Sequence, residues 1–338
     1  MSLRSSRPAP AVLLSLAALL AACADDDLVG SSAEELSASV AADRAALAME
    51  WAPIHYQDVD QTGGHALGGK ADYIARYDFD GDLNGRNNWD RAGNAAYPLS
   101  AHVYYSVVET STHWFLVYLV FHPRDWADGF FDGEHENDAE GVMLTVARDG
   151  STFGELKSAV TVAHKDFFSY VPMDSDWDDG DENIDGVLSL QSFAGGPHPV
   201  TAQEAKGHGM KARPYYDING DGVVYFPSLT TAEVPSGPND RNVLYKLVDI
   251  FAPGGMWASR SNASLFASSG TFAGDTSGGC GSGSMTCSSN SANAPWGWDD
   301  QNDAPGRGAL ARDPAGLVES YFDIPEPVSR EYTYNPYR

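Results

Sequence analysis

From Trp51 onward, short runs of β-branched and aromatic residues alternate with segments rich in Gly, Asp and Pro. This pattern is typical of an all-β protein, because strands end where turn residues begin. It predicts strands over residues 101–108, 113–122, 141–147, 155–162, 186–190 and 223–226. The apolar run from Phe115 to Phe121 indicates a strongly buried strand, and Asp149-Gly150 predicts a hairpin turn after the next strand.

Helical patterns are few. Residues 24–50 form an Ala-rich segment in which Ser32 and Glu35 make a capping box, and residues 242–250 and 314–321 have the only other helical spacing. Residues 257–293 are rich in Ser, Gly, Ala and Asn, which predicts one long loop. We therefore expect residues 51–338 to form a single β-sandwich domain with long acidic and Gly/Ser-rich loops and a few short helices.

The N-terminus has the layout of an export signal. Arg4 and Arg7 precede an apolar stretch over residues 9–20, and Leu20-Ala-Ala-Cys23 follows. These last four residues resemble a bacterial lipobox. The resemblance implies that residues 1–22 are a lipoprotein signal peptide and that residues 23–50 comprise an acylated Cys23, a tether and a short helix. The protein would then be lipid-anchored in the bacterial cell envelope, with the outer membrane favoured over the inner; the alternative is a plain secretory signal with a free Cys23.

Two further cysteines, Cys280 and Cys287, lie in a Gly/Ser-rich stretch over residues 278–289. In an oxidising compartment they most simply form a local disulfide bond. Two cysteines without a nearby histidine make a poor zinc site.

The charge balance narrows the range of partners. The chain has 21 Lys and Arg against 47 Asp and Glu, a net charge of −26. Such a field repels phosphate backbones and so argues against nucleic-acid binding, whereas it suits divalent cations. Beyond the N-terminus, no apolar run reaches the roughly 18 residues that a membrane span needs.

Two acidic loops place oxygen-bearing side chains at alternate positions, as in the first half of a calcium loop. Their residues are Asp78, Asp80 and Asp82, and Asp217, Asn219 and Asp221. Trp89 and Ser228 stand where an EF-hand has its bidentate Glu, so these loops are not EF-hands. They are candidates for structural calcium, or else solvated turns; a third acidic cluster, over residues 174–181, has no clean template.

The residues that could perform chemistry lie at predicted strand ends. They are Asp125, His135, Asp138, Glu140 and His164, with His208 further along the chain. In a β-meander such strand ends converge on one rim, where a hard cation can hold several carboxylates together. The zincin, serine-elbow and phosphate-loop motifs are all absent from the sequence.

The pattern His135-x-x-Asp138-x-Glu140, leading into a strand, resembles the H-x-x-D-W-E motif of the necrosis-inducing NPP1-like proteins and the related Vps62-like proteins. The match covers residues 100–215. The wider pattern, with residues 51–58 and 76–82, also resembles a group of uncharacterised bacterial exported proteins.

This resemblance implies a β-sandwich with a divalent cation, Ca²⁺ or Mg²⁺, in an acidic cavity on one rim. The implied metal residues are Asp125, His135, Asp138, Glu140 and His164, of which the last helps to hold metal-bound water; His208 is a further match. Ala139 replaces the motif tryptophan, and Asn137 stands where the necrosis-inducing branch has a second histidine. These two differences weaken the expectation of toxin activity more than that of a metal site.

Two classes of function follow. The first is an envelope lipoprotein whose cation pocket binds a sugar or a lipid head group. The second is a metal-dependent hydrolase of ester or phosphodiester bonds, in which His164 or His208 would act as general base or acid. No nucleophile or base can be identified independently of the resemblance, so binding is favoured and catalysis stays open.

Overall fold

The computed structural model describes residues 33–127, 133–275 and 292–338. Cys23, Cys280 and Cys287 lie outside the described residues, as does the signal sequence. Lipid attachment and the disulfide bond therefore stay predictions. Within the described part, no helix is both long enough and apolar enough to cross a membrane.

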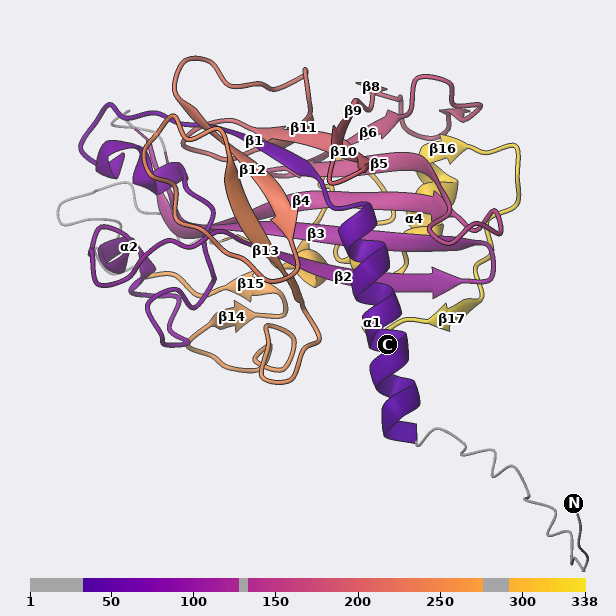
Figure 1. Ribbon diagram of the computed structural model, residues 1–338, viewed down its shortest axis with the longest axis horizontal. Helices are drawn as coiled ribbons and strands as arrows, with labels where there is room; N and C mark the ends of the chain where they lie inside the picture. Colours follow the sequence, from indigo (N-terminus) through magenta and orange to yellow (C-terminus); the bar gives the residue numbers. More distant parts are fainter. Residues whose placement is uncertain (1–32, 128–132, 276–291) are drawn as a thin grey trace, which may run out of the picture. The chain divides into compact units, whose positions relative to one another are not determined.

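Strands dominate the described chain, and helices are short apart from the first (Figure 1). The helical elements are α1 (Ala33–Glu50), η1 (Leu67–Asp72), α2 (Asn88–Arg91), η2 (Pro295–Gly297), α3 (Ala309–Arg312) and α4 (Pro314–Tyr321). The strands are β1 (Ile54–Asp58), β2 (His102–Thr110), β3 (His113–Asp125), β4 (His135–Ala147), β5 (Glu155–Ala163), β6 (Asp166–Val171), β7 (Asp178–Asp179), β8 (Gly186–Val187), β9 (Leu190–Phe193), β10 (Gly196–Gln203), β11 (Met210–Ala212), β12 (Gly222–Ser228), β13 (Val243–Asp249), β14 (Phe266–Ser268), β15 (Thr271–Phe272), β16 (Phe322–Asp323) and β17 (Tyr332–Tyr334).

The long strands all belong to one curled mixed sheet of 13 strands. Its order is β11-β10-β1-β12-β13-β2-β3-β4-β5-β6-β8, with β17 beside β2 and β9 beside β10. The run from β2 to β6 is an antiparallel meander, whereas the pairs β1–β10, β12–β13, β13–β2 and β6–β8 are parallel. The two other described ladders have two strands each. The mostly β class is therefore confirmed, and the expected arrangement as a β-sandwich stays a prediction.

Strand β3 lies between β2 and β4 and is buried on both faces. Phe115 to Phe121 are all buried, as their continuous apolar run predicts for a strand covered on both sides. On one face the C-terminal half of α1 covers it, and the Tyr118 hydroxyl donates to the Ala48 carbonyl at 2.8 Å. Figure 1 shows the part of α1 from Ala41 onward in front of the strands and α4 behind them.

One element was predicted with the wrong type. Residues 242–250, expected to be helical, form strand β13, in which Val243, Tyr245 and Leu247 are buried and the residues between them are partly exposed. Burial therefore alternates with a period of two. In the sequence this period cannot be recognised, because Leu and Val also stand at the partly exposed positions of this short segment. By contrast, α4 spans the predicted helix, and β4 and β5 are joined by the predicted hairpin, in which Gly150 has a φ of 92°.

Strand β4 begins six residues earlier than predicted, so the H-x-x-D-x-E segment is part of the strand rather than a loop before it. In the antiparallel pair, Asp125 lies opposite His135 and His122 lies opposite Asp138. The sheet itself therefore fixes the spacing of these side chains at the end of the β3–β4 pair.

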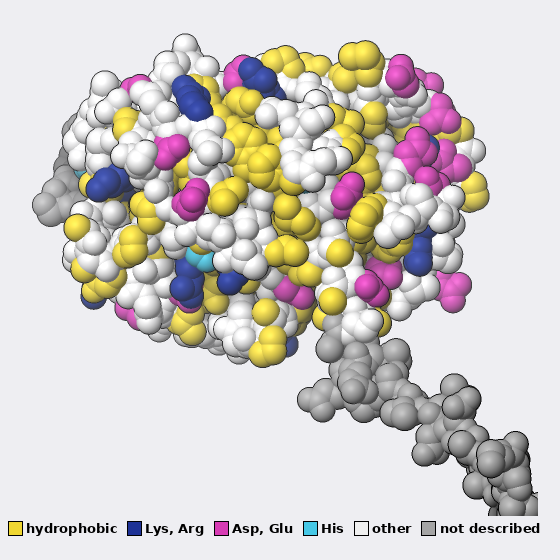
Figure 2. Space-filling view, in the orientation of Figure 1, with side chains coloured by type: hydrophobic (Ala, Val, Ile, Leu, Met, Phe, Trp, Pro, Cys, Tyr) yellow, Lys and Arg dark blue, Asp and Glu magenta, His cyan; other side chains and the backbone are white. Residues whose placement is uncertain are grey.

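The third acidic cluster is a solvent-facing loop. Asp174, Asp176, Asp178, Asp179 and Asp181 are all exposed. On the face drawn in Figure 2, Asp and Glu side chains gather at the right-hand end, where Figure 1 places the loop between β6 and β8. This arrangement is that of solvated turn residues.

Candidate functional site

All five residues predicted to surround a metal line one cavity of about 380 Å³. Asp125, His135, Asp138 and Glu140 come from the end of the β3–β4 pair, and His164 comes from the turn between β5 and β6. Trp298 forms part of the same wall, and its indole N–H donates to the Ala139 carbonyl at 2.9 Å. The remaining lining residues are Gly133, Ala139, Lys165, Thr271, Ala292, Asn293, Asp299, Gln301 and Arg307.

His135 is held as a cation against Asp125. Its Nε2 lies 3.1 Å from Asp125 Oδ2, and its Nδ1 lies 2.9 Å from the Asn137 carbonyl oxygen, so both ring nitrogens face acceptors. Burial lowers the pKa of His135, but the hydrogen bond and charge of Asp125 outweigh it and raise that pKa to about 9. In this arrangement His135 neutralises a carboxylate and has no free nitrogen for a metal.

Glu140 bridges three segments from a fully buried position. Its Oε1 accepts the backbone N–H of His164 at 2.5 Å, and its Oε2 accepts that of Met210 at 2.9 Å. Burial raises the pKa of Glu140 well above its ordinary value, and the nearby charges of Asp138 and Asp125 raise it further. The charges of Asp138 and Asp125 are thus close enough to oppose the ionisation of Glu140.

His208 is buried between two carboxylates. Its Nδ1 lies 3.1 Å from Asp138 Oδ2 and its Nε2 lies 3.2 Å from Asp72 Oδ1, and neither His208 nor Asp72 is accessible to solvent. Burial lowers the pKa of His208, but the two carboxylates raise it to about 10. Sequence reasoning named His208 and Asp138 but missed Asp72, which comes from η1 and belongs to no motif.

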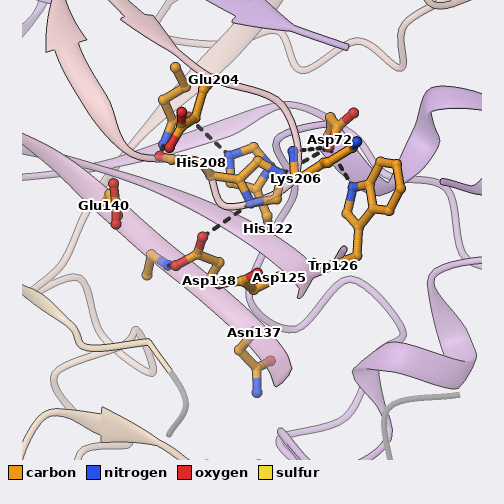
Figure 3. Close-up of polar contacts among 12 residues, drawn as sticks. Asp72, His122, Asp125, Trp126, Asn137, Asp138, Glu140, Glu204, Lys206 and His208 are labelled. Atoms are coloured by element: carbon orange, nitrogen blue, oxygen red, sulfur yellow. Dashed lines mark hydrogen bonds and ion pairs between the residues drawn. The ribbon is translucent and has the colours of Figure 1, made fainter. Parts of the chain in front are cut away.

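His122 stacks on His208 with the two ring centroids 3.8 Å apart and the planes nearly parallel, at 3°. In Figure 3 the two rings lie side by side, with Asp72 and Asp138 on either side of them. Burial and the charge of His208 lower the pKa of His122 well below its ordinary value, so this ring is neutral. Its Nε2 contacts Gln203 at 3.0 Å, and its Nδ1 is buried without a hydrogen-bond partner among the described residues.

His164 is the accessible histidine of the group, with half of its side chain exposed. Its Nε2 lies 3.0 Å from Glu204 Oε1, and this hydrogen bond raises the pKa of His164. Gly209 allows the ring to approach, since a Cβ at that position would lie 3.1 Å from His164 Nε2 and 3.0 Å from Glu204 Oε1. A second hollow of about 490 Å³ lies on the Glu204 side and shares Asp125, Gly133 and His164 with the cavity.

Asn137 points away from the cavity and joins two loops. Its side-chain amide donates to the carbonyls of Gly85 and Ala273 at 2.9 and 2.8 Å, and it accepts a hydrogen bond from Asn88 at 2.6 Å. It lies opposite Pro123, which has no N–H to continue the ladder, and its φ is 63°. At the position where the necrosis-inducing branch has a second histidine, this chain therefore has a structural amide.

The carboxyl groups fit a divalent cation in kind, because Mg²⁺ and Ca²⁺ prefer oxygen ligands and the cavity wall has three such groups, from Asp125, Asp138 and Glu140. As the side chains stand, no group of three or more His, Cys, Asp and Glu in the described part of the chain is placed to hold a metal ion. A cation would therefore be held as Mg²⁺ commonly is, by one or two carboxylates and several waters.

Each carboxylate of the two calcium-like loops is engaged with protein groups through at least one oxygen, although Asp80 Oδ2 is buried without a hydrogen-bond partner among the described residues. Asp78 pairs with Arg76 at 2.7 Å, and Asp217 contacts Arg213 at 2.9 Å. The other carboxylates, Asp80, Asp82 and Asp221, accept hydrogen bonds from neighbouring loop residues, while the Asn219 backbone donates to Asp58. These contacts give each loop an explanation as an ordinary turn, and structural calcium stays a prediction.

Comparison with known proteins finds similar solved structures but no similar sequence family. No family model and no curated protein matches the chain. Among solved structures, one described as NLPPya in complex with glucosamine matches at 13% identity, covering 83% of this chain and 91% of its own, with a TM-score of 0.34. The mannosamine complex of the same protein matches at 14% identity, covering 82% and 90%, with a TM-score of 0.35.

Necrosis and Ethylene inducing Protein 2, from the causal agent of cocoa's Witches Broom disease, is also similar. It matches at 12% identity over 63% of this chain and 88% of its own, with a TM-score of 0.26. The description of this last structure names the kind of protein that the H-x-x-D-x-E segment resembles. At such identities and TM-scores the likeness carries no information about what this chain binds.

Proposed function

We propose that this protein binds a small hydroxyl-rich group, a sugar or a sugar-like lipid head group, in the cavity at the end of the β3–β4 pair. The observation that carries the proposal is that five residues predicted from the sequence line a single cavity, Asp125 and His164 among them. Its volume of about 380 Å³ is at the small end of the range for ligand pockets. That size suits one ring rather than a long chain.

The lining has the two kinds of group that a sugar needs. Carboxylates, amides and a hydroxyl offer hydrogen bonds to the ring hydroxyls, and Trp298 offers an apolar surface beside them. Two of the similar solved structures are described with amino sugars, but the proposal rests on the cavity itself.

A divalent cation in this cavity is the second part of the proposal. One or two of the carboxylates of Asp125, Asp138 and Glu140 would hold it together with several waters, and the cation would polarise ligand hydroxyls. His135 and His208 would not be ligands, since each is engaged on both ring nitrogens. His164 is accessible and lies beside Glu140, with its Nδ1 3.6 Å from Glu140 Oε1.

The hydrolase alternative loses one of its two candidate residues. His208 is inaccessible to solvent and bound to two carboxylates, so it does not meet a ligand. His164, oriented by Glu204, keeps the geometry of a general base, but no nucleophile lies within the described contacts of that pair. Binding is therefore the function that these side chains support best.

The test is a calorimetric titration of the full chain with Ca²⁺ and Mg²⁺, followed by ligand-detected NMR with glucosamine and mannosamine. Asp125→Asn should weaken cation binding at least about tenfold, since it removes one charged ligand from the wall. Asp174→Asn, in the exposed acidic loop, is the matched control and should leave binding unchanged. Identical isotherms for wild type and Asp125→Asn, with sugar signals equally unaffected, would refute the proposal.

We also propose that Cys23 carries a lipid that anchors the protein in the cell envelope, as its lipobox-like setting predicts. Metabolic labelling with a fatty acid should mark wild type but not Cys23→Ser. Labelling that survives this substitution would exclude the anchor.

A further inference from the structure

The cavity has a second set of polar groups that no motif singled out. Besides the carboxylates, two cationic residues line it, Lys165 and Arg307, and three neutral hydrogen-bonding residues do so as well: Thr271, Asn293 and Gln301. The cationic residues come from the β5–β6 turn and from the segment before α3, so they are far apart in sequence and are brought together by the fold.

Arg307 is fixed through one of its nitrogens. Nη2 contacts Thr271 Oγ1 at 2.6 Å, Asn293 Oδ1 at 2.8 Å and the Ser269 carbonyl at 3.4 Å. Thr271 and Asn293 belong to the cavity wall, which places the guanidinium group there too. Across the described ranges, Nη1 and Nε of Arg307 make no hydrogen bond and no ion pair, so the other edge of the planar fork is available to a ligand.

Neither of the two cations has its charge neutralised by a carboxylate of the described chain, as is also true of other bases such as Arg260. Acids outnumber bases by 47 to 21, and bases such as Arg76, Arg213 and Arg330 sit in ion pairs with nearby acids. Neither Lys165 nor Arg307 forms an ion pair in the part of the chain that the structure describes, although Asp299 lines the same cavity. A fork of this kind matches carboxylate and phosphate groups in a bidentate manner.

We propose that the ligand of this cavity is an acidic sugar, a saccharide ring with a carboxylate or phosphate substituent that Arg307 and Lys165 bind. The ring hydroxyls then face the carboxylate side of the cavity and Trp298. This inference rests on the proposed sugar-binding function and specifies its ligand class. A neutral sugar leaves the cationic side of the cavity unmatched, and the net charge of the chain would repel an anion that found no such partner.

The experiment compares three soluble probes on the full chain: glucuronate, glucose 6-phosphate and neutral glucose, each with and without Ca²⁺. Wild type should bind the two acidic sugars about tenfold more tightly than glucose, as expected for one charge-assisted bidentate contact. Arg307→Gln should abolish this preference, so that the two acidic sugars bind this variant no more tightly than glucose does. Lys165→Gln should reduce the preference. Lys165 is exposed and its side chain makes no hydrogen bond or ion pair with the described residues, so this substitution should leave the fold intact.

Arg260→Gln is the matched control. Arg260 stacks on Trp257 and does not line the cavity, so its loss should change no affinity. If wild type binds glucose as tightly as both acidic sugars, the acidic ligand class is wrong while sugar binding stands. If acidic sugars bind equally well to wild type, Arg307→Gln and Lys165→Gln, the anion lies elsewhere and the inference is wrong. If no sugar binds at all, both this inference and the proposed function fail.

Discussion

The Asp72–His208–Asp138 contact predicts that Asp72→Asn will destabilise the protein far more than its modest change in shape suggests. Asp72 is inaccessible to solvent, and its Oδ1 accepts hydrogen bonds from Trp126 Nε1 at 2.7 Å and from the Lys206 backbone at 3.0 Å in addition to the His208 contact. Its Oδ2 accepts the Asp60 backbone N–H at 2.8 Å. All of these partners are donors, so an amide nitrogen at either position meets another donor.

The magnitude follows from two losses. Removing one partner of a buried ion pair costs about 3–5 kcal/mol, and leaving a buried donor unpaired costs about 1–3 kcal/mol. The two costs do not add in full, because the surrounding side chains shift to relieve part of them. We expect the free energy of unfolding to fall by about 4 kcal/mol at pH 7, measured by urea denaturation. Asp60→Asn is the matched control: its carboxylate meets Lys206 Nζ at 3.0 Å in a partly exposed pair, which contributes at most about 1 kcal/mol.

The same contact predicts a pH dependence with a definite sign. Because the folded-state pKa of His208 is raised from 6.5 to about 10, its contribution is fully present below pH 6.5 and is lost as the pH rises toward 10. For His208 alone that loss integrates to about 5 kcal/mol. Asp72→Asn should therefore flatten the alkaline decline of stability relative to wild type. A variant that loses less than about 1 kcal/mol at pH 7 and keeps the full alkaline slope would refute the assigned charge on His208.

Three further predictions concern buried positions. Burial lowers the pKa of His55 to about 4, so the stability that its neutral form contributes is lost as the pH falls from 6.5 toward 4. His55→Gln should therefore reduce the acid-side fall in the free energy of unfolding by about 3 kcal/mol, measured by urea denaturation at several pH values. An equal fall in wild type and variant would contradict this prediction. Asn137→Ala should cost about 3 kcal/mol through its lost hydrogen bonds, while Asn137→Gly should cost about 1 kcal/mol less because glycine adopts its φ of 63° freely; thermal unfolding checks the order of the two. Gly141→Ala should cost about 3 kcal/mol in urea denaturation, since its Cβ would lie 2.0 Å from the Tyr118 carbonyl oxygen; an unchanged midpoint would refute this contact.

The part of the site that could be predicted from sequence is the part made by neighbouring strands. Asp125 and His135 face each other because β3 and β4 form a hairpin, and hairpin partners are adjacent along the chain. Asp138 and Glu140 both line the cavity because they are two apart on an extended strand. Local pairing rules therefore suffice to place these four carboxylate and imidazole groups together.

The part that could not be predicted depends on long-range topology. Asp72 reaches His208 from a short 3₁₀ segment with no periodic pattern, across 136 positions of sequence. Arg307 reaches the cavity from the segment before α3, and it belongs to no sequence motif. The same limit applies to the strand order, because nothing in a strand's own sequence says whether its partner is parallel, as between β12 and β13, or whether all strands join one sheet.

The backbone is strained at several positions around the cavity, as is common at functional sites. Four non-glycine residues with positive φ lie at or beside it: Asn137, His164, Lys206 and His208. Each left-handed L-residue costs roughly 1–2 kcal/mol, so such conformations persist only where side-chain contacts offset them.

His208 shows which contacts do so. Glycines at positions 207 and 209 flank it, and a glycine at 208 itself would remove the backbone cost. The histidine is instead held by its ring, which both carboxylates bind. His208→Gly should therefore still destabilise the protein, even though it relaxes the backbone. If that variant proved as stable as wild type, the His208 ring would have no structural role. The strained backbone at this position could then not be explained by the contact through which His208 holds Asp138 at the cavity wall.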